Sequence, residues 1–399
     1  MALLSGWRGW RLFQKLPWDW RNIVVYSETG QDWHQFSGLV EQLNGPLEQS
    51  VCYVTSDRND PGLQRTHPRF KSIYLPEGFF LTLFFQTHAS DLFVLTMMDL
   101  GNLHLKRSLQ PVYYVYIFHS MGSTHMVDHA NSFDHYDSLF CAGPHQVAEI
   151  RRREQLKGLE PKHLFEFGHP RLEQVIEEGR QWRNSQHAQA TLASGSTEHP
   201  VVLVAPTWGD TSIFNVCGAK LIDVLLGSGC RVIMRPHYHS NRLTPEVIAA
   251  VRNRFAGRDG FSYVDRMGET GSLLQSHVLV SDWSAMALEY ALGLEKPVVF
   301  IDVPRRIRNP DWRELGIEPI ESSIREQLGR IVVPDQLERL PAVVRELLKH
   351  PGNFTARVRA LRARTVFRLG RSIEDGAVEL ARLADRQRQA RLDRERGHV

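Results

Sequence analysis

Four short polar segments of this sequence each follow an apolar run of the kind that forms a buried strand. They contain histidine, arginine, threonine, serine and aspartate, the residue types that transfer protons and bind phosphate. In chain order the segments are Phe118-His119-Ser120, Ala205-Pro206-Thr207-Trp208, Arg235-Pro236-His237 and Ser281-Asp282-Trp283-Ser284. Because α/β proteins bind ligands at the carboxyl ends of parallel strands, we expect all four segments to line one cleft.

The first three segments suit a base and an anion site. His119 can act as a general base near neutral pH, and a hydrogen-bonded structural histidine is the alternative. Thr207 can donate a hydrogen bond to a phosphate or a sugar, or lie in a simple turn set by Pro206. Arg235 supplies a charged fork for a diphosphate and His237 a donor when protonated, while a salt bridge from Arg235 to a neighbouring helix is the alternative.

The fourth segment lies between the strand at 278–280 and a run with apolar residues at helical spacing, MALEYAL, which we expect to end at Gly293. The first N–H groups of this helix, with the hydroxyls of Ser281 and Ser284, would bind phosphate oxygens. Asp282 would repel a phosphate, so we expect it to orient His237 or to bind a ribose hydroxyl. The alternative is that Asp282 and Ser284 only cap the helix.

Strands alternate with helices along most of the chain, which predicts two Rossmann-like, doubly wound parallel sheets that face a cleft. The expected strands are 22–27, 51–56, 71–75, 91–96, 111–120, 138–142, 163–168, 201–208, 230–237, 261–265, 278–280 and 298–301. The expected divisions are an N-terminal arm at 1–20, an acceptor domain at 21–182, a linker at 183–200, a nucleotide-donor domain with closing helices at 201–385, and a charged tail at 386–399, solvated or frayed.

Composition agrees with a globular protein of two domains. The chain has 399 residues, of which 42% are hydrophobic and 23% charged. A net charge of +3 gives no argument for nucleic acid, and the four cysteines show no paired spacing, so we expect reduced thiols. No secretory signal is visible, and the apolar blocks at 79–85 and 92–98 are too short to span a bilayer, which predicts a cytoplasmic protein.

The first twenty residues hold four tryptophans among basic side chains. Trp7, Trp10 and Phe13, with Arg8 and neighbouring cations, would suit the interface of an anionic membrane, on the inner surface of the cell. The alternative is an arm that packs on its own protein.

These motifs resemble the CDP-glycerol glycerophosphotransferase family, the teichoic acid polymerase group with a GT-B-type fold. The resemblance covers about residues 110–385 and is carried by FHS at His119, APTW at 205–208, RPH at 235–237 and SDWSAMALEYA at 281–291. It implies transfer of a glycerol-phosphate or related polyol-phosphate unit from a CDP-activated donor to a hydroxyl of a lipid-linked or polysaccharide acceptor, in teichoic acid or capsule-like synthesis.

The resemblance also implies roles for single residues. His119 would deprotonate the acceptor, His237 would bind the donor diphosphate with Arg235 nearby, and the turn at 281–284 would hold phosphate. The sequence departs from the family where Gly209 follows APTW in place of an arginine, where Ala285 replaces a second serine, and where no WHG-like tripeptide accompanies His119. We therefore expect one phosphate contact and the acceptor site to differ.

Two other hypotheses concern chemistry. His125 and His129 lie four residues apart, as two metal ligands on one helix would, but no further ligand motif accompanies them. We therefore expect no metal and no cofactor, and a helix here that lines the acceptor side.

The rival functions are a nucleotide-sugar glycosyltransferase or epimerase of the same fold, and a non-catalytic polysaccharide-assembly protein.

Overall fold

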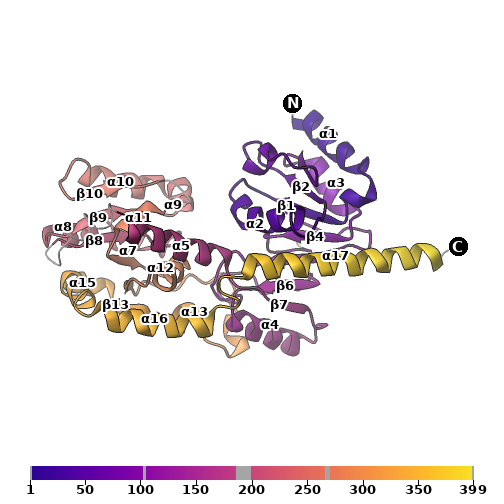
Figure 1. Cartoon of the computed structure of the whole chain (residues 1–399). Coiled ribbons are helices and arrows are strands. Elements are labelled where there is room, and N and C mark those ends of the chain that lie inside the picture. The colour runs from indigo at the N-terminus through magenta and orange to yellow at the C-terminus, as the bar shows by residue number, and fades with distance from the viewer. Residues whose placement is uncertain (1, 102–104, 186–198, 266–269, 398–399) are drawn as a thin grey trace. The chain divides into compact units, whose positions relative to one another are not determined.

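The computed structural model describes residues 2–101, 105–185, 199–265 and 270–397 (Figure 1). These residues form two compact units. Unit 1 comprises Met1–Ser120, Asp128–Pro170 and Val366–Val399, and unit 2 comprises Met121–Val127 and Arg171–Thr365. Each unit contains one parallel β-sheet with helices, as the alternating pattern predicts.

The sheet of unit 1 has seven strands in the order β3-β2-β1-β4-β5-β6-β7, all paired in parallel. Every residue of its central strands β1 and β4 is buried, because apolar runs form strands that are covered on both faces. The strands are β1 (Ile23–Ser27), β2 (Val51–Thr55), β3 (Phe70–Tyr74), β4 (Leu92–Leu95), β5 (Tyr113–Ile117), β6 (Ser138–Cys141) and β7 (His163–Glu166).

The helices of unit 1 come from both ends of the chain. They are α1 (Ala2–Gln14), α2 (Trp33–Asn44), α3 (Phe79–Thr87), α4 (Pro144–Lys157) and α17 (Ser372–Gly397), with short 3₁₀ turns at Trp18–Trp20 and Pro61–Gln64. The N-terminal arm is therefore a helix that packs with one face on its own unit. The ring of Phe13, which is fully buried, meets the ring of Phe84 of α3 edge to face at 4.9 Å.

Unit 2 has a six-stranded parallel sheet in the order β10-β9-β8-β11-β12-β13. Its strands are β8 (Val201–Val204), β9 (Arg231–Met234), β10 (Phe261–Tyr263), β11 (Val278–Ser281), β12 (Val298–Ile301) and β13 (Gly329–Val332). β13 was not among the predicted strands. This edge strand is short and exposes its two middle residues, so it lacks the buried apolar run that identifies the others.

The helices of unit 2 are mostly short. They are α5 (Pro170–Asn184), α7 (Ile213–Cys217), α8 (Lys220–Gly227), α9 (Tyr238–Leu243), α10 (Pro245–Phe255), α11 (Gly271–Gln275), α12 (Met286–Leu294), α13 (Ile320–Ser323), α14 (Arg325–Leu328), α15 (Leu340–Leu347) and α16 (Pro351–Thr365), with 3₁₀ turns at Trp312–Leu315 and Pro334–Arg339. Helix α12 ends at Leu294, one residue beyond the predicted Gly293, and Glu295 follows in a left-handed conformation.

The division of the chain differs from the predicted one at the C-terminus. Residues 366–385 belong to unit 1, and the predicted charged tail at 386–399 continues helix α17 to Gly397. The guanidinium of Arg391 lies 2.9 Å from the buried carboxylate of Asp91, so this end of the helix is tied to unit 1. Most of the predicted linker, residues 186–198, lies outside the described residues.

Close packing between helix α17 and unit 1 gives a test of this assignment. A Cβ atom on Gly376 would overlap the ring of Phe167, which is fully buried. We therefore expect Gly376→Val to lower the free energy of unfolding by about 1–3 kcal/mol, measured by urea denaturation with circular dichroism. Gly352→Ala is the control, because its added methyl group meets no atom within 4 Å beyond the adjacent residues and the backbone of its own helix. Equal stability of the two variants would contradict the packing.

Candidate functional site

The turn after β11 is built around the carboxylate of Asp282, which is 1% exposed. One oxygen accepts a hydrogen bond from the backbone N–H of Thr207 at 2.7 Å, and the other accepts from the N–H of Ile213 at 3.2 Å. Both donors belong to the segment that follows β8, the neighbouring strand. Asp282 therefore ties two adjacent strand-end turns of unit 2 together.

This placement corrects the role predicted for Asp282. Its hydrogen bonds to described residues go to backbone N–H groups and none to His237, and the side chain is closed off from a ribose. Burial raises the pKa of Asp282 to about 6, against the opposing effect of the hydrogen bonds from Thr207 and Ile213.

The hydroxyls predicted to bind phosphate differ in exposure. Ser281 is fully buried, and its Oγ donates to the carbonyl of Ala205 at 2.8 Å, so this hydroxyl holds the two turns together. Thr207 is 9% exposed, and Ser284 is partly exposed. Helix α12 begins at Met286 and its N-cap is Ala285, one residue later than the predicted cap at Ser284. Ser284 is the better placed of the two serines to meet a ligand.

The turn after β9 holds His237 in a defined tautomer. Its Nδ1 accepts a hydrogen bond from the backbone N–H of His239 at 3.1 Å, which caps helix α9. An accepting Nδ1 carries no proton, so in the neutral ring the proton is on Nε2. His237 therefore presents an N–H donor without being charged, which refines the prediction that it donates when protonated.

The surroundings of His237 keep it neutral. Burial lowers its pKa to about 4, with further lowering by the charges of His239, Arg306 and Arg235. Arg235 donates from Nη1 to the hydroxyl of Ser272 at 3.2 Å, a neutral partner, so this contact differs from the salt bridge considered as the alternative. The positive charge at this turn comes from arginine.

A stack of planar side chains extends this cluster. The guanidinium carbon of Arg306 lies 3.4 Å from the ring centroid of Trp208, a cation–π contact. The ring of His239 lies 4.7 Å from that of Trp208 and 5.3 Å from that of His237, nearly parallel to the latter at 19°. The sequence analysis did not single out His239 or Arg306. The three arginines within residues 305–308 after β12 were the available signal.

In unit 1, His119 is exposed and lies just beyond β5, which ends at Ile117, three residues before the predicted end of this strand. Its Nδ1 lies 3.5 Å from the hydroxyl of Tyr116. Burial raises the pKa of Asp32, and the charge of His119 opposes that shift, so the two side chains are within electrostatic range. Asp32 follows β1 and was not among the predicted site residues.

The predicted helix around His125 and His129 is absent, since residues 119–137 form turns and bends. His125 is 4% exposed, and its Nε2 lies 3.0 Å from the carbonyl oxygen of Ile317, which places this ring in the interior of unit 2. Within the part of the chain that the structure describes, no three histidine, cysteine, aspartate or glutamate side chains gather as metal ligands would. The helical spacing argument for a metal pair is therefore wrong.

Two other predictions concern reduced cysteines and membrane-spanning segments. All four cysteines are free thiols, and Cys217 is the most exposed of them. Among the helices that the structure describes, none combines the length and apolar character needed to cross a bilayer.

Comparisons with known proteins agree with the predicted resemblance. Residues 120–304 match the family model described as CDP-glycerol:poly(glycerophosphate) glycerophosphotransferase. This segment includes the turns after β8, β9 and β11 with their polar residues. No curated protein matches significantly. The family match indicates a transferase enzyme.

The fold is similar to that of several solved structures at low sequence identity. A histidine-to-asparagine variant of the wall teichoic acid polymerase TagF soaked with CDPG aligns with a TM-score of 0.59 and 14% identity, over 95% of this chain and 94% of that chain. The UDP-GlcNAc 2-epimerase of Methanocaldococcus jannaschii gives 0.52 and 13%, over 86% and 98%. A trehalose 6-phosphate synthase of Burkholderia multivorans gives 0.52 and 12%, over 91% and 99%. The predicted GT-B-like fold is confirmed.

The raised pKa of Asp282 predicts how stability responds to pH. A carboxyl group with a pKa of about 6 when folded and 3.8 when unfolded gives stability that is full below pH 3.8 and is lost as pH rises through 6. Asp282→Asn cannot titrate. We therefore expect Asp282→Asn to be less stable than wild type by a margin that is about 1 kcal/mol larger at pH 5 than at pH 7.5. The free energy of unfolding is measured by urea denaturation at both pH values.

Asp210→Asn is the matched control, because Asp210 is exposed in the turn after β8. Its difference from wild type should be the same at both pH values. A penalty for Asp282→Asn that is equal at both pH values, or larger at pH 7.5, would contradict the buried carboxylate.

Proposed function

We propose, on the premise that residues 120–304 match the CDP-glycerol:poly(glycerophosphate) glycerophosphotransferase family, that the protein transfers a glycerol-phosphate or related polyol-phosphate unit. The donor is a CDP-activated polyol, and the acceptor is a hydroxyl of a cell-surface polymer such as a teichoic acid or capsule polysaccharide. One observation carries the proposal beyond the family match: the cluster of Arg235, His237, His239 and Arg306 at the carboxyl edge of the unit 2 sheet.

This cluster suits the donor diphosphate. His237 donates one hydrogen bond from Nε2 while staying neutral, and Arg235 and Arg306 supply the permanent positive charge. Ser284 and the N-terminus of α12, a helix of nine residues, add uncharged donors in the neighbouring turn. Stabilising the departing cytidine monophosphate by fixed donors and charges is the main task of such a site.

His119 is the base in this proposal. It takes the proton of the acceptor hydroxyl, whose oxygen attacks the phosphorus that bears the polyol. The bond from that phosphorus to the oxygen of cytidine monophosphate breaks, and the nucleotide leaves with the electron pair. The nearby carboxylate of Asp32 favours the protonated form of His119 that results. The imidazolium then returns its proton to solvent.

A nucleotide-sugar transferase or epimerase is the second candidate, favoured by the likeness to a UDP-GlcNAc 2-epimerase and a trehalose 6-phosphate synthase. Both chemistries need a diphosphate site of the kind proposed for unit 2. A sugar transferase releases a nucleoside diphosphate, whereas the proposed reaction releases cytidine monophosphate. The non-catalytic alternative rests on Gly209 and Ala285 alone.

We also propose that helix α1 attaches the protein to the cytoplasmic face of an anionic membrane. Its outer face exposes four apolar side chains, of which Leu3 is 70% and Leu4 is 66% exposed. The others are Trp7 and Leu12. Arg8, Arg11 and Lys15 accompany them, and the helix holds no acidic residue. Apolar side chains enter the headgroup region while the cations meet anionic lipid.

The catalytic roles predict loss of activity without loss of folding. We expect His119→Ala to lower the rate of transfer by about 10²–10⁴-fold through loss of the base, and His237→Ala by about 10²–10³-fold through loss of a phosphate donor. The measurement is CMP release from CDP-glycerol with a synthetic lipid that ends in one glycerol phosphate.

His199→Ala is the control, because His199 lies outside both histidine clusters and is exposed. His237→Asn tests whether a neutral N–H donor is sufficient at this position, since asparagine keeps a capping oxygen and an uncharged N–H donor but cannot become positively charged. It should retain more activity than His237→Ala. Full activity of either alanine variant would remove that histidine from the mechanism.

Membrane attachment through α1 predicts that its outer apolar side chains are needed for binding to vesicles. We expect the combined variant Leu3→Ser, Leu4→Ser, Trp7→Ser and Leu12→Ser to bind vesicles of phosphatidylglycerol and phosphatidylethanolamine at least tenfold more weakly than wild type in co-sedimentation. The control carries serine at two leucines exposed elsewhere, Leu109 and Leu243. Equal binding by wild type and both variants would exclude α1 as the anchor.

A further inference from the structure

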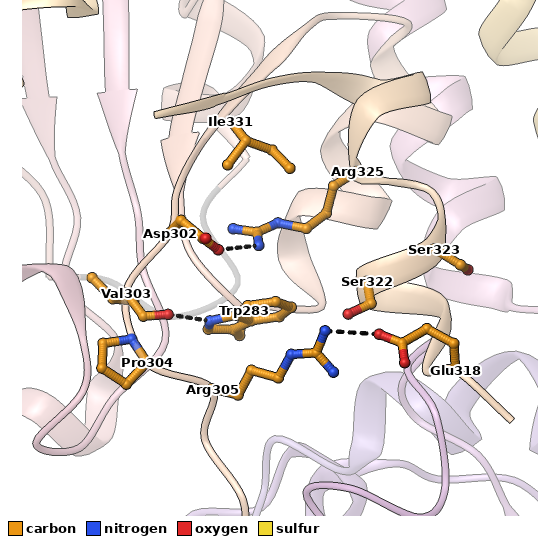
Figure 2. Close-up of a pocket in the computed structure, with 10 residues that line it drawn as sticks. All are labelled: Trp283, Asp302, Val303, Pro304, Arg305, Glu318, Ser322, Ser323, Arg325 and Ile331. Carbon is orange, nitrogen blue, oxygen red and sulfur yellow. Dashed lines mark hydrogen bonds and ion pairs between the residues drawn. The ribbon is translucent and has the colours of Figure 1, made fainter. Parts of the chain in front are cut away.

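A cavity of about 550 Å³ lies in unit 2 beside the turn after β11 (Figure 2). Its lining is rich in charged and hydroxyl side chains, with one large aromatic ring. The lining residues are Trp283, Asp302, Val303, Pro304, Arg305, Glu318, Ser322, Ser323, Arg325 and Ile331.

The indole of Trp283 lies between two guanidinium groups, as Figure 2 shows. The guanidinium carbon of Arg325 is 4.0 Å from the ring centroid and that of Arg305 is 5.1 Å away. Trp283 is fixed by a hydrogen bond from Nε1 to the carbonyl of Val303 at 2.8 Å. The ring therefore contacts two cations, and all three side chains line one cavity.

Each arginine is held by one carboxylate. Arg325 contacts Asp302 at 2.8 Å, and Arg305 contacts Glu318 at 2.7 Å. The Asp302 and Glu318 side chains are 44% and 51% exposed, so a ligand can reach both carboxylates. The Arg305 side chain is 31% exposed, so the Arg305–Glu318 pair can exchange its contact for water or ligand at little cost. The Arg325 side chain is only 4% exposed, and its buried Nε makes no hydrogen bond to the residues described.

These groups match a ligand that carries both a phosphate and hydroxyls. A guanidinium that turns from a carboxylate to a phosphate gains a second negative oxygen and a planar, two-point contact. The released carboxylate then accepts hydrogen bonds from hydroxyl groups, as Ser322 and Ser323 also can. A bare inorganic anion satisfies the arginines but leaves the carboxylates facing negative charge.

The cavity adjoins the proposed donor site. Trp283 directly follows Asp282, and Arg305 directly precedes Arg306. Arg306 stacks on Trp208 of the donor cluster, while Arg305 lies over Trp283 in the cavity. One segment after β12 therefore contributes an arginine to each of the two sites.

We propose that this cavity binds a polyol phosphate, as a subsite next to the donor diphosphate. The inference rests on the proposed function for the identity of its ligand. The same chemistry has two sources. One is the polyol phosphate at the end of the acceptor, and the other is the polyol of the donor together with the distal phosphate of the donor diphosphate.

The test measures binding of sn-glycerol 3-phosphate to the full-length protein by isothermal titration calorimetry. We expect wild type to bind it, with affinity at least tenfold higher than for inorganic phosphate or glycerol. Arg305→Gln should bind at least tenfold more weakly. Arg313→Gln is the matched control, because Arg313 lies outside the cavity, over the ring of Trp312 at 4.5 Å, and is exposed. It should bind as wild type does.

Saturating CDP-glycerol separates the two sources. If sn-glycerol 3-phosphate binds as well in the presence of CDP-glycerol as in its absence, the cavity is assigned to the acceptor unit. If CDP-glycerol competes with sn-glycerol 3-phosphate, in Arg313→Gln as in wild type, the cavity is assigned to the polyol phosphate of the donor. Equal affinity of wild type and Arg305→Gln, or equal affinity for phosphate and glycerol 3-phosphate, would overturn the proposal.

The failure of the proposed function has a different signature. A protein that binds glycerol 3-phosphate through Arg305 but releases no CMP from CDP-glycerol would keep the cavity and lose the function. If wild type and Arg305→Gln release CMP equally well, with the same KM for both substrates, the proposed function would stand and the proposed role of the cavity would be wrong.

Discussion

The buried carboxylate of Asp282 is the contact on which the candidate donor site depends. A carboxylate enclosed in protein requires hydrogen-bond donors, and two of those it finds belong to the segment after β8. The hydroxyl of Ser281 adds a third link, to the carbonyl of Ala205. Together with the parallel pairing of β8 and β11, these bonds fix the position of Trp208 relative to Trp283.

In the candidate donor site the positive charge is carried by arginines, and the fixed turns position the rings that these arginines contact. Trp208 supports the guanidinium of Arg306, and Trp283 lies between those of Arg305 and Arg325. His237 is kept neutral by burial and by its bond to the backbone of His239. Arginine keeps its charge at any physiological pH, so the site can neutralise a diphosphate without taking up a proton. His237 contributes one hydrogen-bond donor of fixed direction, its Nε2–H.

Much of the fold follows from the sequence because buried parallel strands are nearly continuous apolar runs. β1, β8 and β11 all have this form, and the predicted polar segments at 205–208 and 281–284 lie at the ends of β8 and β11. β13 was missed because an edge strand needs no such run. The return of α17 to unit 1 was missed because it depends on tertiary contacts, such as that between Arg391 and Asp91, rather than on local pattern.

The candidate site shows the same limit. His119, His237 and Arg235 could be identified from their positions after strands, but the direction of a side chain could not. Asp282 and Ser281 face the interior, whereas sequence reasoning placed them toward a ligand. Arg306 joins Trp208 only after the sheet has brought the segments after β12 and β8 together. His125 and His129 have helical spacing but lie in a segment without a helix.

The central claim is that unit 2 binds a cytidine diphosphate linked to a polyol. The most direct measurement is the melting temperature of the purified protein with CDP-glycerol, CDP, UDP and UDP-sugars at equal concentrations, since a ligand that binds the folded state raises it by mass action. The account predicts a rise with the cytidine compounds that is lost in Arg306→Gln. A rise with uridine compounds alone, or equal rises in wild type and Arg306→Gln, would contradict it.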